Sequence, residues 1–328
     1  MTTYKEIFGK YVKNYSSDPT ADAEGQVWYN STSGTFKSEV LAPAAWASGG
    51  NMTTARRILF GTGTQTAGLA AGGTELSSGD SNATEEYNGS TWGPGGNLGT
   101  AKNKGGSAGT QTAGLVFGGY SNPAGFLTQT EEYDGSTWSP SGNIGTARYL
   151  AAGAGIQTAA LMFSGYVPGS PAVTNATEEY DGSTWTAGGN LGTARYSGAG
   201  AGTQTAGLMF GGSATPGVTN ATEEYDGSAW TAGGTMNTAR SSLAGAGLQT
   251  AALAFGGNLP PPFSAATELY NGTSWTNSAN LATARTSLGG AGTQTSGLAF
   301  GGFGPPPNSA ATEEFTSGTT AVKTITTS

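Results

Sequence analysis

The chain has 328 residues and contains no cysteine and no histidine. These absences exclude disulfides, thiol chemistry, zinc sites built from Cys and His, and catalysis by a histidine base. They do not fix the cellular compartment, because proteins without disulfides occur in every compartment. We expect no cofactor and no metal site.

Charged residues are scarce, at 10% of the chain against about 25% in typical proteins. The net charge is −8 and no basic run occurs, so the electrostatic footprint of nucleic-acid binding is missing. No apolar stretch reaches the roughly 20 residues of a membrane-spanning helix, so we expect no membrane insertion. The first segment, MTTYKEIFGKYVKNYSSDPT, lacks the apolar core of a secretory signal, which predicts synthesis in the cytoplasm without a signal peptide.

Tryptophan recurs at nearly constant spacing in this glycine-rich chain, with intervals of 46, 46, 47, 45 and 45 residues. The six positions are Trp46, Trp92, Trp138, Trp185, Trp230 and Trp275. A period of this length, built from short apolar runs and glycine turns, is typical of a β-propeller with one four-stranded blade per repeat.

Residues 194–234 illustrate one repeat. Its small-residue run YSGAGAG suits a crowded strand near an axis, and the apolar run AGLMFGG suits a strand buried on both faces. A third strand, ATEEY, is followed by Asp-Gly, which predicts a two-residue hairpin because type I′ turns need positive φ. The fourth strand begins at Trp230, whose ring we expect to pack against the neighbouring repeat.

Three features of this pattern resemble the kelch repeat: a basic residue opening the first strand, an apolar run ending in Gly-Gly, and a Tyr and a Trp separated by four residues. The basic residues are Arg56, Lys102, Arg148, Arg195, Arg240 and Arg285. The resemblance covers about 46–315 and implies an all-β, kelch-like β-propeller. The third repeat departs from it at Ser164-Gly165, and the sixth has Phe315 in place of the Tyr.

Six basic positions and six Gln turns predict six blades. Trp46 precedes every other strand, whereas the last third strand, at 311–315, has no Trp after it. We therefore expect residues 44–50 to complete the last blade and close the ring, which removes an open edge. The alternating segment 319–328 competes for the same place; if displaced, it would add outside that strand or pair with another subunit. The expected domains are 1–43 (arm and hairpin), 44–318 (propeller) and 319–328 (C-terminal strand).

All variation in repeat length falls in one loop, between the Gly-Gly of the second strand and the Thr-Glu of the third. In repeat proteins the face that collects such variation is often the binding face. Its candidate binding residues, expected to be exposed, are Tyr120, Phe126, Tyr166, Phe263 and Phe303. Sugar rings and partner proteins both stack on aromatic rings. The alternative is that these loops vary because nothing constrains them.

Adjacent glutamates such as Glu131-Glu132 recur in nearly every repeat. Neighbours on a strand point to opposite faces, and an active site is usually singular, so we expect these pairs to be structural and the protein not to be an enzyme. We expect each repeated basic residue to pair with a glutamate of its own or the next repeat. The alternative is that the six basic residues surround the axis and attract an anion.

Residues 24–40 predict a hairpin, with strands QVWYN and TFKSEV joined at STSG. The stretch DPTADAEGQVWYNSTSGTFK is similar to a segment near the start of fibre and appendage proteins of tailed bacteriophages. Together with the Gly/Ala/Thr-rich kelch-like repeats, it resembles structural proteins of tailed marine phages, including those infecting cyanobacteria. A hairpin that merely covers an edge of the ring is the simpler alternative.

This resemblance implies a non-enzymatic virion protein on the particle surface, as a tail fibre, appendage or capsid decoration. Its arm would attach to other virion proteins, the chain would form a homo-oligomer, and the propeller would bind a glycan or protein of the host surface. Two alternatives remain. One is a self-assembling filament or surface-layer subunit linked by exchange of terminal strands, and the other is a glycan-active enzyme.

Overall fold

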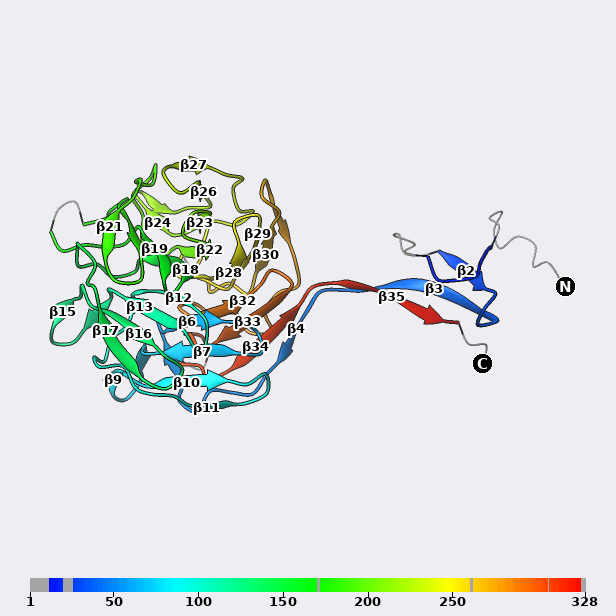
Figure 1. Cartoon of the computed structure of the whole chain (residues 1–328), viewed down its shortest axis with the longest axis horizontal. Coiled ribbons are helices and arrows are strands. Elements are labelled where there is room, and N and C mark those ends of the chain that lie inside the picture. The colour runs from blue at the N-terminus through cyan, green and yellow to red at the C-terminus, as the bar shows by residue number, and fades with distance from the viewer. Residues whose placement is uncertain (1–11, 20–25, 170–171, 260–261, 306, 326–328) are drawn as a thin grey trace. The chain divides into compact units, whose positions relative to one another are not determined.

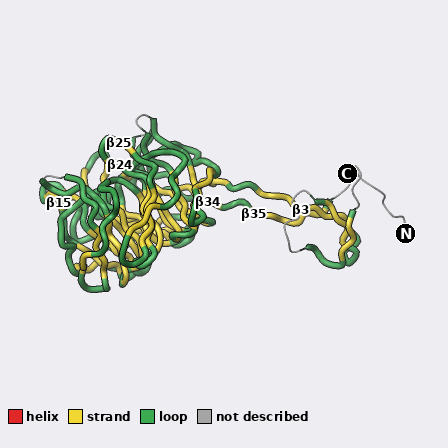
Figure 2. The backbone as a smooth tube through the Cα atoms, turned by 90° about the horizontal axis from the view of Figure 1, so that it is seen from above, coloured by secondary structure: helices red, strands yellow, loops and turns green. Residues whose placement is uncertain are grey.

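The computed structural model describes residues 12–19, 26–169, 172–259, 262–305 and 307–325. Within these ranges the chain forms strands and loops and no helix (Figure 2), so no helix there could cross a membrane. The chain divides into two compact units: Met1–Ala45 with Ser317–Ser328, which we call the terminal unit, and Trp46–Thr316, the repeat body.

The repeated sheets are antiparallel, four-stranded and propeller-like, and in the first five the strands of a sheet are arranged side by side in their order along the chain. The first sheet comprises β6 (Phe60–Gly63), β7 (Gly68–Ala71), β10 (Thr84–Tyr87) and β11 (Trp92–Pro94). The second comprises β12 (Gly106–Gly109), β13 (Gly114–Phe117), β16 (Thr130–Tyr133) and β17 (Trp138–Ser141). The third comprises β18 (Ala152–Ile156), β19 (Ala159–Phe163), β20 (Thr177–Tyr180) and β21 (Trp185–Ala187).

The remaining repeats form sheets of the same kind. The fourth comprises β22 (Ala199–Gly202), β23 (Gly207–Phe210), β26 (Thr222–Tyr225) and β27 (Trp230–Ala232). The fifth comprises β28 (Ala244–Leu248), β29 (Ala251–Phe255), β30 (Thr267–Tyr270) and β31 (Trp275–Asn277). The last comprises β32 (Gly289–Gly292), β33 (Ser296–Phe300), β34 (Thr312–Thr316) and, from the other end of the chain, β4 (Ala45–Ser48).

Strand β4 contains Trp46, so the N-terminal segment favoured from the sequence takes the fourth place of the last sheet. The competing C-terminal segment forms β35 (Thr319–Thr324) and pairs instead with β3 (Thr35–Ala42). The terminal unit also contains β1 (Lys13–Tyr15) and β2 (Val27–Asn30), in the order β1-β2-β3-β35. The antiparallel pairing of β2 with β3 confirms the predicted hairpin.

Short strands within the loops accompany the main sheets. Strands β5 (Arg56–Arg57), β8 (Thr74–Glu75) and β9 (Gly79–Asp80) form a three-stranded sheet, and β14 (Tyr120–Ser121) pairs with β15 (Gly125–Phe126), as β24 (Ser213–Ala214) does with β25 (Gly217–Val218). All except β5 lie in the variable loops, so several of these loops are themselves built as hairpins.

The first strands of the sheets lie innermost in Figure 1, and each contacts the first strand of the next repeat, with β32 contacting β6. Glycine makes this approach possible: a Cβ at Gly200 would lie 2.4 Å from the carbonyl oxygen of Gly153 in the adjacent strand. The second strand of each sheet lies between the first and the third, and in the fourth repeat its residues Leu208, Met209 and Phe210 are fully buried. The small and the apolar runs therefore have the places expected from their composition.

Each repeated tryptophan bonds to the preceding sheet through its indole N–H. The acceptor is the hydroxyl of the threonine that opens the third strand there, as for Trp275 and Thr222 at 3.0 Å. The other pairs are Trp46–Thr267, Trp92–Thr312, Trp138–Thr84, Trp185–Thr130 and Trp230–Thr177. The tryptophans therefore join neighbouring repeats.

The turn between the third and fourth strands differs from the prediction. It has four residues, as in Asp181-Gly182-Ser183-Thr184, and only Gly182 has positive φ. A carboxylate oxygen of Asp181 accepts the main-chain N–H groups of Ser183 at 2.9 Å and Thr184 at 2.7 Å. These bonds lower the pKa of Asp181 to about 2. A side-chain-capped turn has replaced the two-residue hairpin because the Asp side chain supplies the acceptor.

The second glutamate of each adjacent pair links repeats through tyrosine. The hydroxyl of Tyr270 donates to Glu224 of the preceding repeat at 2.5 Å. Equivalent bonds join Tyr87–Glu314, Tyr133–Glu86, Tyr180–Glu132 and Tyr225–Glu179. The contact between the fifth and sixth repeats is the exception, because Phe315 replaces the tyrosine and Leu269 replaces its glutamate. Losing both together leaves no buried polar group unpaired.

This exception gives a mutational test. Phe315→Tyr alone should lower the free energy of unfolding by about 1–3 kcal/mol, because its hydroxyl would meet Leu269 without an acceptor. Adding Leu269→Glu should recover at least half of that loss in denaturant titrations. Additive losses in the double variant would show that these positions do not form an inter-repeat pair.

Candidate functional site

Each repeat buries one basic side chain against a glutamate of its own third strand. The pairs are Arg56–Glu85, Lys102–Glu131, Arg148–Glu178, Arg195–Glu223, Arg240–Glu268 and Arg285–Glu313. In the last pair the nitrogen and oxygen are 2.9 Å apart. All six basic side chains are thus engaged inside the protein and do not form a ring of free cations.

One such pair ties three segments together. Arg285 also donates to the carbonyl oxygens of Gly301 at 3.0 Å and Ala311 at 2.7 Å, at the two ends of a variable loop. The second oxygen of Glu313 accepts the main-chain N–H of Ala282 at 2.6 Å. Burial lowers the pKa of Arg285 while the charge of Glu313 raises it. Guanidinium groups stay protonated in proteins, so the pair is ionic.

The residue after each buried basic residue pairs with the first residue of the variable loop. Tyr149, next to Arg148, forms a β-bridge with Tyr166, and Thr286, next to Arg285, forms one with Phe303. The buried pair therefore positions the outer surface of its own loop.

The next residue of each repeat has a left-handed backbone, with φ between +51° and +61°. These six mouth residues are Ile58, Lys104, Leu150, Ser197, Ser242 and Ser287. Each donates its main-chain N–H to the carbonyl of the mouth residue in the preceding repeat, and Ile58 donates to Ser287. Together they line an outer cavity of about 110 Å³.

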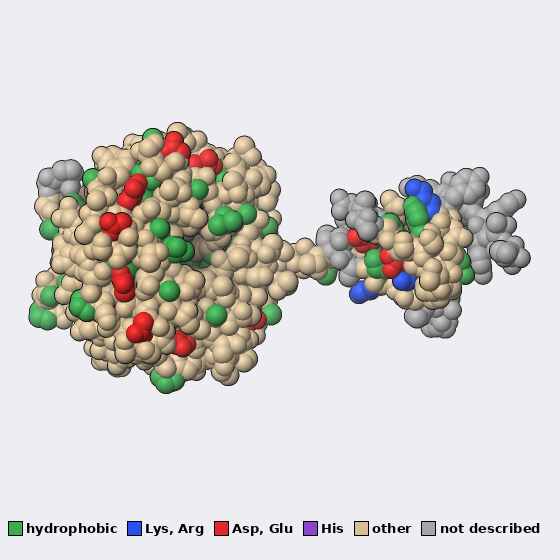
Figure 3. Space-filling view, in the orientation of Figure 1, with side chains coloured by type: hydrophobic (Ala, Val, Ile, Leu, Met, Phe, Trp, Pro, Cys, Tyr) green, Lys and Arg blue, Asp and Glu red, His purple; other side chains and the backbone are tan. Residues whose placement is uncertain are grey.

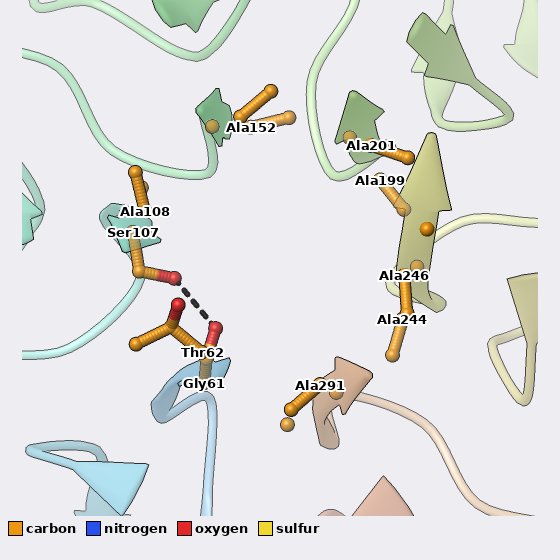
Figure 4. Close-up of a pocket in the computed structure, with 18 of the residues that line it drawn as sticks. Gly61, Thr62, Ser107, Ala108, Ala152, Ala199, Ala201, Ala244, Ala246 and Ala291 are labelled. Atoms are coloured by element: carbon orange, nitrogen blue, oxygen red, sulfur yellow. Dashed lines mark hydrogen bonds between the residues drawn. The ribbon is translucent and has the colours of Figure 1, made fainter. Parts of the chain in front are cut away.

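An inner cavity of about 230 Å³ adjoins the outer one and shares lining residues with it. Figure 4 shows its wall, formed by glycines and alanines of the first strands, with the Ser107 hydroxyl donating to the Gly61 carbonyl oxygen at 2.9 Å. None of its lining residues is charged. The inner cavity therefore offers mainly backbone groups and apolar side chains, with the hydroxyls of Thr62 and Ser107 bonded to main-chain carbonyls.

Five aromatic rings from neighbouring repeats form a continuous cluster, which we call the aromatic shelf: Tyr120, Phe126, Tyr149, Tyr166 and Tyr196. The centre of the Tyr149 ring lies 4.9 Å from that of Phe126 and 5.5 Å from that of Tyr166. All five side chains are partly buried. Burial raises the pKa of Tyr149, and the neighbouring tyrosines raise it further.

The other two candidate aromatics form a separate pair, with the ring centres of Phe263 and Phe303 5.5 Å apart. The guanidinium carbon of Arg57 lies 4.8 Å from the centre of the Phe303 ring. The structure thus brings three of the five candidates together on the shelf and the remaining two in this pair. It partly buries all five instead of exposing them.

Sequence reasoning missed Tyr149, Tyr196 and Lys104. Their signal was positional: each follows a buried basic residue by one or two places. Those places join the variable-loop surface through backbone pairing between segments distant in sequence, which the repeat pattern alone does not reveal.

The repeat body has eight basic residues, of which six form the buried pairs and Arg57 and Lys104 remain. The Lys104 ammonium lies 5.4 Å from the centre of the Tyr149 ring. Figure 3 shows one face of the repeat body with acidic side chains and no Lys or Arg. Arg57 and Lys104 make no ion pair within the described residues; both lie over aromatic rings and neither is visible on that acidic face.

No group of three or more potential metal-ligating side chains occurs within the part of the chain that the structure describes. No protein-family model matches the chain, and no curated protein matches it. Its function therefore has to be argued from the geometry above.

Lys102 is the one lysine among the buried basic residues, and it makes no bond to loop carbonyls like those of Arg285. We expect Lys102→Arg to raise the free energy of unfolding by about 1–3 kcal/mol, by adding up to two main-chain bonds. Lys102→Met is the control and should cost about 3–5 kcal/mol, because it leaves Glu131 buried without a counter-charge. A destabilised Lys102→Arg protein would contradict the equivalence of the six sites.

The inter-repeat tyrosines predict alkaline instability. Burial and the bonded glutamates raise the pKa of Tyr87, Tyr133, Tyr180, Tyr225 and Tyr270 to about 12, above the ordinary value of about 10. Because the folded pKa is raised, their stabilisation is complete below pH ~10 and is lost as pH rises through ~12. Unfolding titrations should show this fall together with tyrosinate absorbance. A flat profile over that window would contradict the bonded state.

Proposed function

We propose that the six sheets are the blades of a closed, kelch-like β-propeller. Three observations support closure: β4 from the N-terminal part completes the last sheet, β32 contacts β6, and the main-chain bonds of the mouth residues return from Ile58 to Ser287. The bonds Tyr87–Glu314 and Trp92–Thr312 join the first and last repeats in the same way as the others.

We propose further that the protein is a non-enzymatic structural component of a tailed-phage particle that presents this propeller for binding to the host surface or a partner protein. The observation that carries the proposal is the contrast within the repeats. Interior contacts recur in repeat after repeat, whereas the variable loops and the segments that pair with them carry unlike aromatic rings and the cations of Arg57 and Lys104.

The adjacent glutamates support a structural role over an enzymatic one. The first of each pair bonds a buried basic residue, and the second accepts a tyrosine hydroxyl from the next repeat, as Glu223 and Glu224 do. Both carboxylates therefore have repeated structural partners. The alternative of a filament linked by exchanged terminal strands is less well supported, since β35 pairs with β3 of its own chain.

The terminal unit is the proposed attachment arm to other virion proteins. Its single four-stranded sheet leaves large apolar side chains partly exposed, among them Val27, Val40 and Val322. Among the described strands, β1 and β35 lie at the two edges of this sheet, and an edge strand can pair with a strand of another chain.

Immunogold imaging and mass spectrometry of purified particles test this function. We expect the protein at the particle surface, and particles carrying a chain that lacks 1–43 should lose it although the repeat body folds. Its absence from particles would overturn the virion role. Filaments formed by the purified protein alone would favour the alternative.

A further inference from the structure

Lys104 connects two features of the variable-loop face. It is one of the mouth residues around the outer cavity, and its ammonium lies over Tyr149 at the centre of the aromatic shelf. Tyr149 and Tyr196 directly precede the mouth residues Leu150 and Ser197. The shelf and the outer cavity therefore form one continuous surface.

The mouth side chains occupy backbone positions that glycine would fill with less strain. A non-glycine residue with left-handed φ costs about 1–3 kcal/mol, and in each repeat the main-chain bonds between neighbouring mouth residues hold it in that conformation. Three of the six are serines, at 197, 242 and 287, which line the outer cavity on one side. Ile58 and Leu150 separate these serines from Lys104 in the series of main-chain bonds, so the Lys104 ammonium is the donor beside the shelf that suits an oxyanion.

The shelf offers the complementary chemistry. Tyrosine rings present an apolar face for stacking and a hydroxyl for hydrogen bonds, the combination that suits the C–H face and hydroxyl groups of a pyranose. Asp80 approaches the shelf at Asn122, but its carboxylate oxygens are occupied by Asn103 and by the main-chain N–H of Asn122. Within the described residues, Lys104 makes no ion pair.

We propose that the shelf and the outer cavity form a binding site for a saccharide that carries carboxylates, such as a uronic-acid oligomer. A carboxylate binds at Lys104, where the outer cavity meets the shelf, and neighbouring sugar rings stack on Tyr149 and Tyr166. The outer cavity, at about 110 Å³, receives the acidic group, and the sugar rings lie on the shelf. Single-stranded nucleic acid fits less well, because its phosphates need more than one nearby cation.

Calorimetric titration of the full chain tests the proposal with a mannuronic-acid hexasaccharide and the same oligomer with its carboxylates reduced to alcohols. The acidic probe should bind at least about tenfold more tightly, as expected for a charge-assisted contact. Lys104→Gln should weaken the acidic probe to the affinity of the reduced one and leave the reduced probe unchanged. Lys323→Gln is the matched control: it removes the same charge from an exposed lysine of the terminal unit and should change neither affinity.

Tyr166→Ala should weaken both probes, whereas Tyr166→Phe, which keeps the ring, should retain most of the binding; thermal unfolding verifies that each variant folds. Equal affinity for the two probes, no binding of either, or binding of a thymidine oligomer alone would each overturn the proposal. The inference deepens the proposed function and rests on it, yet the two fail separately: a virion protein that ignores the probes refutes only the saccharide site.

Discussion

The structure depends on a charge pair buried six times, once in each repeat. Burying an ion pair is costly unless its remaining donors and acceptors are satisfied. Here the guanidinium of Arg285 also bonds two loop carbonyls, and the second oxygen of Glu313 accepts a main-chain N–H. In a chain with so few charges, the pairs built on Arg56, Arg148, Arg240 and Arg285 hold both ends of a variable loop.

Three successive residues connect the buried ion pair to the surface of the repeat body. Arg148 is buried in the pair, Tyr149 pairs with the loop and joins the shelf, and Leu150 turns into the outer cavity. The same sequence of roles recurs in each repeat, so substitutions at the second and third places change the surface without disturbing the first. A regular framework can in this way carry an irregular binding face.

Periodicity made much of the fold predictable. The tryptophan spacing, the small and apolar runs and the position of Trp46 identified the repeated sheets and the strand that completes the last one. The turn type predicted for Asp-Gly was wrong because the Asp side chain caps a longer turn. The paired replacement of a glutamate by Leu269 and of a tyrosine by Phe315 can be interpreted only when the contact between repeats is known. The shelf residues Tyr149 and Tyr196 were not predicted because their position depends on pairing between segments distant in sequence.

Amide hydrogen exchange in an Arg148→Met variant tests most directly whether the buried pair positions the surface. The bonds between the main chains of Tyr149 and Tyr166, and that from Leu150 to Lys104, depend on it in this account. Protection of these amides should fall at least about tenfold, while the equivalent amides of Thr286 and Phe303 keep theirs. Unchanged protection at Tyr149 and Tyr166 in a folded variant would show that the loops are positioned without the pair.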